Sequence, residues 1–192
     1  MNERIFNPAK RQRLNNPERL EWIQPEKLWN FINCSHPKVV VDIGAGTGYI
    51  TQALAKFHPS AVFLALDIEP LMIDEMNQSF APNTNIIPKL MEPNKIPLQD
   101  NFADLIININ VYHEFDDEVK NLKEIYRVLQ PEGKVLIIDW EKKHESCERG
   151  PAYDHRISME TVMKDLASAN FMDIRSTADL KFHYALCATK HI

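Results

Sequence analysis

The sequence predicts an α/β fold, in which a mostly parallel β-sheet carries helices on both of its faces. The first observation behind this prediction is that apolar, strand-like runs alternate with segments whose apolar residues recur at helical spacing. These runs span residues 39–41, 61–66, 86–87, 102–110 and 134–139. The second observation is that two further strand-like runs, 173–180 and 182–189, are joined by a tight turn without a helix between them. They indicate an antiparallel pair at the end of the sheet.

Length and composition favour a single domain. The chain has 192 residues, and 44% of them are hydrophobic, which is enough for one sizeable core. We expect residues 1–192 to form one domain, with 1–37 as an N-terminal helical arm and 38–192 as the core. The formal net charge of −5 does not favour binding to a nucleic-acid backbone, and it is compatible with a small-molecule substrate.

The cysteine pattern and hydropathy indicate a cytoplasmic protein. Cys34, Cys147 and Cys187 are widely spaced and form no C-x-x-C motif, so a disulfide framework or structural zinc site is not expected. No apolar run approaches the length of a membrane span, and the N-terminus lacks the apolar core of a signal peptide. We expect a monomer or homodimer without a membrane span.

The N-terminal arm has few apolar residues over positions 1–20, so we expect it to be irregular. Its basic residues lack an amphipathic apolar pattern and are interpreted as a solvated or lid-like segment. They are Arg4, Lys10, Arg11 and Arg13. Asn16-Pro17-Glu18 has the sequence of a helix start, with Asn16 as the cap and Pro17 at the first helical position. Helix-like spacing follows and is interrupted at Pro25.

Further helices are expected along the chain. One spans 70–80, one follows a cap at Asp116 or Asp117, and one follows a cap at Ser158. Residues 140–153 are polar and charged, and we expect them to form an insertion over the mouth of the binding pocket.

The most informative stretch is 39–49, which reads VVVDIGAGTGY. A β-branched run ends at Asp42, and a turn with Gly44, Gly46 and Gly48 leads into a helical apolar pattern. The chain has only 5 glycines, so this clustering indicates a backbone that needs positive φ or approaches a ligand closely. A helix that begins there directs free N–H groups and a positive dipole end at the turn.

Two classes of ligand compete for this turn. A dinucleotide fingerprint, G-x-G-x-x-G, requires glycine where this chain has Tyr49. The carboxylate of Asp42 would also repel a pyrophosphate, whereas it suits a ligand with an ammonium group. S-adenosylmethionine (SAM) carries such a group together with a ribose. Asp67 follows the second strand-like run, about 20 residues after the glycines, where a ribose-binding acid is expected.

The segment DIGAGTG at 42–48 resembles motif I of the class I SAM-dependent methyltransferases. The run YRVLQPEGKVLIID at 126–139 resembles the R-x-L-K-P-G-G pattern of the same superfamily. The general pattern is most similar to the small-molecule, ubiquinone/menaquinone-methyltransferase-like branch. The resemblance implies a doubly wound, Rossmann-like mixed sheet of seven strands in the order 3-2-1-4-5-7-6, with strand 7 antiparallel. It also implies that the arm folds over the pocket as a lid.

The resemblance implies SAM as the cofactor, with Asp42 near its ammonium group, Asp67 on its ribose hydroxyls and Ile68 against its adenine. Glu92 occupies the position of the family acid that binds adenine, but it replaces the usual aspartate, and Pro93 has no N–H to donate. The expected cofactor-binding residues are Asp42, Gly44, Ala45, Gly46, Tyr49, Asp67, Ile68, Glu92, Asn108 and Ile109.

His113 is the expected catalytic base, because it follows the fourth strand and an imidazole titrates near neutral pH. Glu114 is placed to orient it, and the alternative is that His113 only packs in the pocket wall. Weaker candidates, expected at the wall or surface, are Tyr49, Asp139, His155 and His183. We expect no metal site, because the mixed donors available lie mainly on the polar loop. These donors are Asp139, His144, Glu145 and Cys147.

The predicted function is methyl transfer from SAM to a small-molecule nucleophile, with S-adenosylhomocysteine (SAH) as the product. A nucleic-acid partner is not expected. The alternatives are a non-catalytic SAM or SAH sensor or partner subunit and, less favoured, a nicotinamide-linked oxidoreductase.

Overall fold

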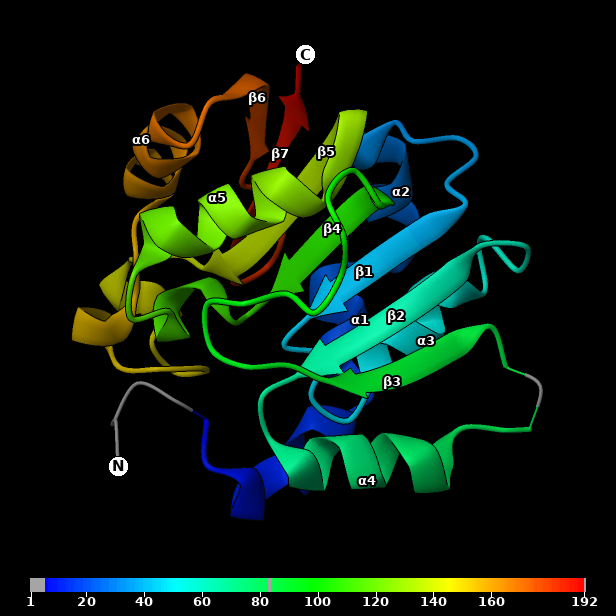
Figure 1. Ribbon diagram of the computed structural model, residues 1–192. Coiled ribbons are helices and arrows are strands. Elements are labelled where there is room, and N and C mark those ends of the chain that lie inside the picture. Colours follow the sequence, from blue (N-terminus) through cyan, green and yellow to red (C-terminus); the bar gives the residue numbers. More distant parts are fainter. Residues whose placement is uncertain (1–5, 83, 192) are drawn as a thin grey trace.

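The computed structural model describes residues 6–82 and 84–191 and confirms the α/β class (Figure 1). Within these residues, seven strands form one sheet in the order β3-β2-β1-β4-β5-β7-β6, which is the predicted order. The strands are β1 (Val39–Ile43), β2 (Val62–Asp67), β3 (Ile86–Leu90), β4 (Ala103–Ile109), β5 (Leu129–Trp140), β6 (Phe171–Thr177) and β7 (His183–Lys190). Neighbours among β1–β5 pair in parallel, whereas β7 is antiparallel to both β5 and β6.

Helices cover both faces of the sheet (Figure 1). One face is packed by α1 (Glu18–Ile23), α2 (Pro25–Ile32), α3 (Tyr49–Ala55) and α4 (Pro70–Ser79). The other face is packed by α5 (Glu118–Val128) and α6 (Met159–Ser168). The central strands are therefore buried on both sides, which explains their continuous apolar sequences.

The helix caps follow from the sequence. The side chains of Asp117 and Ser158 accept hydrogen bonds from backbone N–H groups in the first turns of α5 and α6, as expected. Gln24 adopts a left-handed conformation (φ 51°), and α2 begins directly after it at Pro25. The predicted interruption between two short helices is confirmed.

The arm is more regular than its composition indicates, and the expectation of an irregular segment was wrong for the 3₁₀ helix η1 (Pro8–Asn15). The side chain of Asn7 caps it, and Arg11 Nε binds Glu75 Oε2 on α4 at 3.1 Å. Local capping and tertiary contacts thus order a segment that has no apolar periodicity. Arg4 of the basic cluster lies outside the described residues.

The predicted starts that differ most from the structure are those of β5 and β6. β5 begins at Leu129 rather than Lys134, because Leu129 pairs with Ala103 before a register shift. β6 begins at Phe171 rather than residue 173, because Phe171 is buried and pairs with Lys190 of β7. Both differences depend on pairing partners that are distant in the sequence.

The insertion between β5 and α6 is organised by Arg156. It contains the short 3₁₀ helices η3 (His144–Ser146) and η4 (Tyr153–His155). The buried guanidinium donates hydrogen bonds to the carbonyl oxygens of Glu141 (2.8 Å), Pro151 (3.0 Å), Ser146 (3.1 Å) and Arg149. One side chain therefore holds several turns of an otherwise polar loop together.

Aromatic side chains join the arm to the sheet. Trp22 of α1 contacts Trp140 at the end of β5 and Phe182, with ring centroids 6.4 Å and 5.4 Å apart. The guanidinium of Arg149 lies over the Trp22 ring, so the insertion contacts the same cluster. No helix in the described residues is long and apolar enough to cross a membrane.

The first strand is anchored at its start by Asp104, whose Oδ2 accepts hydrogen bonds from the backbone N–H groups of Lys38 (2.7 Å) and Val39 (2.8 Å). Asp104→Ala should lower the free energy of unfolding by about 1–3 kcal/mol, because two backbone donors lose a charged acceptor. Urea denaturation measures the change. Asp104→Asn keeps an acceptor oxygen and should lose less, and the exposed Glu148→Ala serves as a control. Equal midpoints for Asp104→Ala and wild type would contradict the anchoring role.

Candidate functional site

The parallel pairing brings the carboxyl ends of β1, β2, β4 and β5 to one edge of the sheet, where binding sites of this architecture form. Asp42 lies at the end of β1 and is only 3% exposed. Thr51 Oγ1 of α3 donates a hydrogen bond of 2.5 Å to Asp42 Oδ2. Burial raises the pKa of Asp42 to about 7, although the bond from Thr51 opposes the shift.

The glycine-rich turn approaches its neighbours too closely for side chains. Gly44 has φ 71°, and an added Cβ would lie 2.4 Å from the side chain of Val111. Gly46 has φ 58°, and an added Cβ would lie 2.8 Å from Leu14 of the arm. The backbone N–H groups of Gly44 and Ala45 both donate to the carbonyl oxygen of Leu66. The turn is therefore a backbone surface that requires glycine.

Asp67 ends β2 and faces this turn. Its Oδ2 accepts a hydrogen bond from the Gly46 N–H at 2.8 Å, and its Oδ1 accepts one from the Glu69 N–H at 3.0 Å. Burial raises the pKa of Asp67, and these backbone hydrogen bonds oppose the shift. The next residue, Ile68, is 38% exposed and presents an apolar surface beside the carboxylate. The negative charge of Asp67 also contributes to the raised pKa of Asp42.

Asn108 and Ile109 lie at the end of β4, and both are buried. Neither the Nδ2 nor the Oδ1 of Asn108 has a hydrogen-bond partner among the described residues. A fully buried amide without a partner is rare in proteins and indicates a position that a ligand or water satisfies. Tyr49, another predicted contact, is the first residue of α3 and is half-buried.

Glu92 is the predicted residue that the structure leaves at the surface. It lies in an exposed turn, and its carboxylate is 3.8 Å from the ammonium group of Lys95. Together with Leu90, Met91 and Pro97, these two residues line a shallow pocket of about 180 Å³. Met91 N–H donates to the Asp67 carbonyl, so the turn is joined to the carboxyl end of β2.

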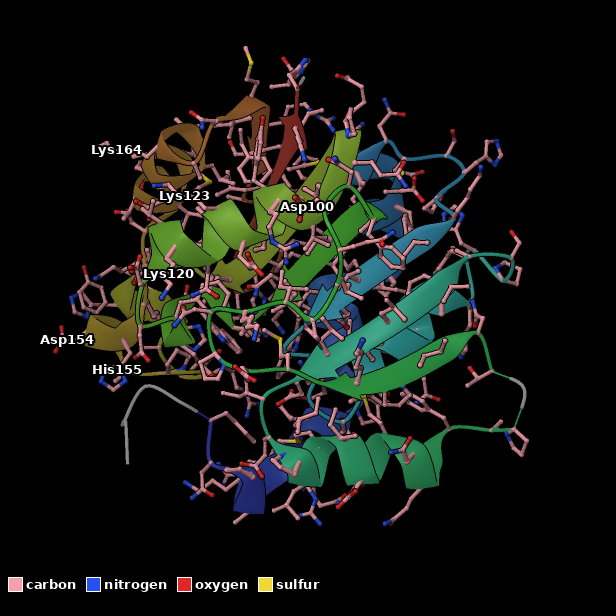
Figure 2. All side chains as sticks on the ribbon, viewed as in Figure 1. Asp100, Lys120, Lys123, Asp154, His155 and Lys164 are labelled. Atoms are coloured by element: carbon pink, nitrogen blue, oxygen red, sulfur yellow. The ribbon has the colours of Figure 1, made fainter. Side chains whose placement is uncertain are left out.

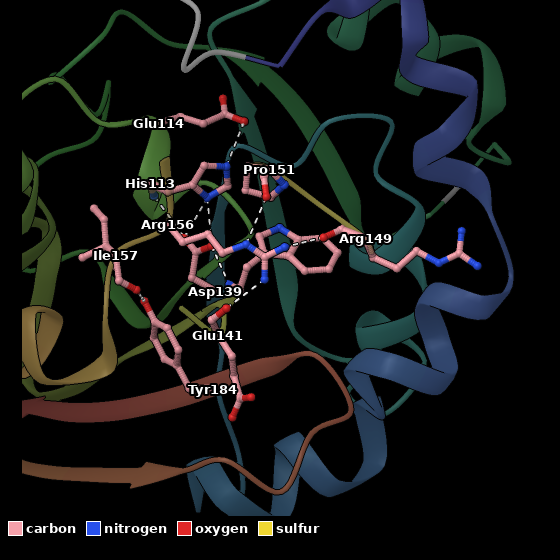
Figure 3. Close-up of polar contacts among 10 residues, drawn as sticks. His113, Glu114, Asp139, Glu141, Arg149, Pro151, Arg156, Ile157 and Tyr184 are labelled. Atoms are coloured by element: carbon pink, nitrogen blue, oxygen red, sulfur yellow. Dashed lines mark hydrogen bonds and ion pairs between the residues drawn. The ribbon is translucent and has the colours of Figure 1, made fainter. Parts of the chain in front are cut away.

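His113 lies in the short 3₁₀ helix η2 (Tyr112–Glu114) and is bound by Asp139 at the end of β5 (Figure 3). The distance from His113 Nδ1 to Asp139 Oδ1 is 2.8 Å, and the backbone N–H of His113 donates to Asp139 Oδ2 at 3.0 Å. The side chains of both residues are buried. A carboxylate only accepts hydrogen bonds, so Nδ1 carries the proton and Nε2 of the neutral ring is an acceptor.

Glu114 Oε1 lies 3.9 Å from His113 Nε2, beyond a hydrogen bond. The sequence pointed to Glu114 as the residue that orients His113, whereas in the structure Asp139 makes the hydrogen bonds. Sequence reasoning missed this contact, although one signal was present. Asp139 is the first acid after an apolar strand, in the same position as Asp42 and Asp67.

The surroundings of His113 and Glu114 shift the pKa of both side chains. Burial disfavours the charged imidazolium, but the charge and hydrogen bond of Asp139 outweigh it, so the pKa of His113 is raised. Burial raises the pKa of Glu114 to about 7, while His113 and a hydrogen bond from the Phe6 backbone oppose the shift.

The N-terminal arm contacts several parts of the site. Leu14 lies against Gly46, and Thr47 Oγ1 donates to Asn15 Oδ1 at 2.6 Å. The hydrogen bond from Phe6 to Glu114 brings the arm to the side chain next to His113. Residues from the arm, the glycine-rich turn and η2 therefore meet at the same edge.

The weaker candidates separate into surface and buried residues. His155 lies at the outside of the molecule beside Asp154 (Figure 2). His183 is fully buried, and its pKa is lowered to about 3 by burial, so it is neutral. His144 stacks on Tyr153. No group of three or more His, Cys, Asp or Glu side chains within residues 6–82 and 84–191 is arranged to hold a metal ion.

The arrangement fits a cofactor with a cationic and a hydroxylated part. It offers buried carboxylates at the ends of β1 and β2, a glycine backbone between them, and the unsatisfied amide of Asn108. Beyond these, the His113–Asp139 pair can accept a proton at Nε2.

A protein-family profile described as a methyltransferase domain matches residues 41–137, from within β1 through most of β5. An uncharacterized methyltransferase-like protein from Schizosaccharomyces pombe is 32% identical over 126 residues, which are 66% of this chain and 45% of that protein. A ubiquinone/menaquinone biosynthesis C-methyltransferase from Desulfotalea psychrophila is 30% identical over 100 residues, which are 52% of this chain and 40% of that protein. The chain thus spans less than half the length of these curated relatives.

A solved methyltransferase structure is also similar to this chain. A SAM-dependent methyltransferase from Aquifex aeolicus superposes with a TM-score of 0.88 at 29% sequence identity. The match covers 97% of this chain and 100% of that one, so it includes the arm and the terminal strand pair.

Asp139→Asn should lower the pKa of His113, because the charge that stabilises the imidazolium is removed while burial remains. NMR titration of the His113 ring measures the change. A raised folded-state pKa contributes stability below the ordinary histidine pKa, and this contribution is lost as pH rises through the raised value. Wild type should lose stability across that window and Asp139→Asn should not. An unchanged His113 titration would show that Asp139 does not control it.

Proposed function

Because this chain belongs to the class I SAM-dependent methyltransferase family, we propose that it methylates a small-molecule acceptor and that His113 removes the acceptor's proton. The observation that carries the second part is the hydrogen bond from His113 Nδ1 to Asp139, which leaves Nε2 as the free acceptor of a buried, fixed ring. The cofactor contacts below belong to the same proposal.

The cofactor contacts follow from charge and backbone shape. Asp42 suits the ammonium group of SAM, and Asp67 suits the ribose hydroxyls, because a carboxylate can accept from two hydroxyl groups at once. Gly44 and Gly46 allow close approach of the backbone between these acids. The amide of Asn108 is a further polar group for this pocket, and Ile68 offers apolar area to adenine. To bind adenine, Glu92 would have to break its ion pair with Lys95.

Bound SAM supplies an electrophilic methyl group on a sulfonium, so the chain mainly has to position the acceptor and accept a proton. Neutral His113 receives that proton at Nε2. Asp139 holds Nδ1–H throughout and stabilises the imidazolium that forms. The activity of the enzyme should therefore rise as pH rises through the raised pKa of His113, because only the neutral ring can accept.

A small acceptor is favoured by the enclosure of His113. His113 is 5% exposed, and the neighbouring Glu114 accepts a hydrogen bond from the Phe6 backbone of the arm. A group on a macromolecule would need a long extension to reach such a ring, whereas a small molecule can be enclosed. The net charge of −5 also gives a nucleic acid little attraction.

Asp67→Ala should weaken SAH binding by about 100-fold, because charge-assisted bonds to the ribose are lost. Isothermal titration calorimetry measures the affinity. Asp74→Ala, an exposed acid on α4, is the matched control and should bind as wild type does. Retention of full SAH affinity by Asp67→Ala would rule out the ribose contact.

His113→Ala should lower kcat about 10²- to 10⁴-fold while SAH affinity stays unchanged. The acceptor is first identified by incubating metabolite extracts with methyl-labelled SAM and determining the product mass. His155→Ala, which changes a histidine at the outside of the molecule, should retain activity. If His113→Ala turns over like wild type, the proton is removed elsewhere or no base is needed.

A further inference from the structure

The proposed contacts leave one charged group of the cofactor without a partner. The amino-acid end of SAM is a zwitterion, with an ammonium and a carboxylate on the same carbon atom. Asp42 suits the ammonium, but the residues assigned to the site so far include no cation for the carboxylate. A buried carboxylate without a counter-charge is unfavourable, so this part of the site needs a positive group.

Arg19, in the first turn of α1, is the best candidate for a cation that binds the SAM carboxylate. Its guanidinium binds the backbone of Leu14, whose side chain lies against Gly46, so Arg19 lies on the arm next to the glycine-rich turn. The negative charge of Asp42 favours the protonated form of Arg19 and opposes the effect of burial on its pKa. Arg19 Nη1 donates to the Leu14 carbonyl oxygen at 2.6 Å. That bond fixes the side chain against η1 and leaves most of the five guanidinium donors for other partners.

Arg19 lacks the partner that a half-buried arginine usually has. Among the described residues it forms no direct ion pair with a carboxylate, not even with Asp42. Burial lowers the pKa of Arg19 to about 10, so the group stays charged at neutral pH. Because Arg19 and Asp42 form no ion pair with each other, both charges are available to groups of a ligand.

We propose that Arg19 binds the carboxylate of SAM, so that the arm and the end of β1 hold opposite charges of the cofactor's amino-acid group. This inference rests on the proposed cofactor contacts. The guanidinium matches a carboxylate in a two-bond geometry. Two side-chain hydrogen bonds, Thr47 to Asn15 and Arg11 to Glu75, hold the arm in the position that this contact requires. The arm is then part of the cofactor site as well as its cover.

The test compares SAM with decarboxylated SAM, which keeps the ammonium and lacks only the carboxylate. Wild type should bind SAM about 10- to 100-fold more tightly than decarboxylated SAM. Arg19→Met should lose that difference by weakening SAM alone, and its affinity for decarboxylated SAM should stay within about twofold of wild type. Arg19→Lys keeps the charge without the planar fork and should recover part of the preference. All titrations are done without an acceptor, so a carboxylate of the acceptor cannot account for the result.

Arg13→Met is the matched control, because Arg13 lies exposed on the same arm. It should bind both ligands as wild type does. The inference is overturned if wild type binds the two ligands equally, or if Arg19→Met weakens both to the same extent. If Arg19→Met fails to fold, the ratio of SAM to decarboxylated SAM affinity in wild type and in Arg19→Lys still tests the inference. If wild type binds neither SAM nor SAH, the proposed function itself fails, and that result is distinct from a lost preference.

Discussion

The site depends on one constraint, which is that parallel strands end at the same edge of a sheet. Asp42, Asp67 and Asp139 each close a strand of the same parallel set, so three acids far apart in the sequence are collected at one place. Their chemistry then differs through their partners. Asp67 is engaged by backbone N–H groups and Asp139 by a histidine. Asp42 has a single hydroxyl donor, and burial raises its pKa to about 7.

Much of the fold was readable from the sequence because its signals are local. The glycine-rich turn, the caps at Asp117 and Ser158 and the break at Pro25 each depend on a few adjacent residues. Strand limits were harder, since the start of β5 is fixed by pairing with Ala103. Within the site, the positions of the strand-end acids followed from the pattern. The contact between His113 and Asp139 did not, because the strand-end position of Asp139 brings it to the same edge but does not specify that the ring binds it and not Glu114.

The structure of the arm was harder to predict from the sequence than the site itself. Its first part, around η1, has no apolar periodicity and is fixed by individual polar contacts with α4 and with the glycine-rich turn. Arg19 therefore could not be assigned from spacing alone. Its relation to Asp42 exists only after α1 has packed against the sheet. The contacts within the insertion could not be predicted from sequence either. Arg156 binds backbone carbonyl oxygens, and these are present at every residue.

The contact between Trp22 and Trp140 has an optical consequence. One indole belongs to α1 of the arm and the other to the end of β5, and their ring centroids are 6.4 Å apart in an edge-on arrangement. Indole emission is sensitive to neighbouring rings and to water, and both indoles are shielded here. Any displacement of α1 from the sheet alters the surroundings of both fluorophores together. The intrinsic tryptophan fluorescence of the unlabelled protein therefore reports the position of the arm.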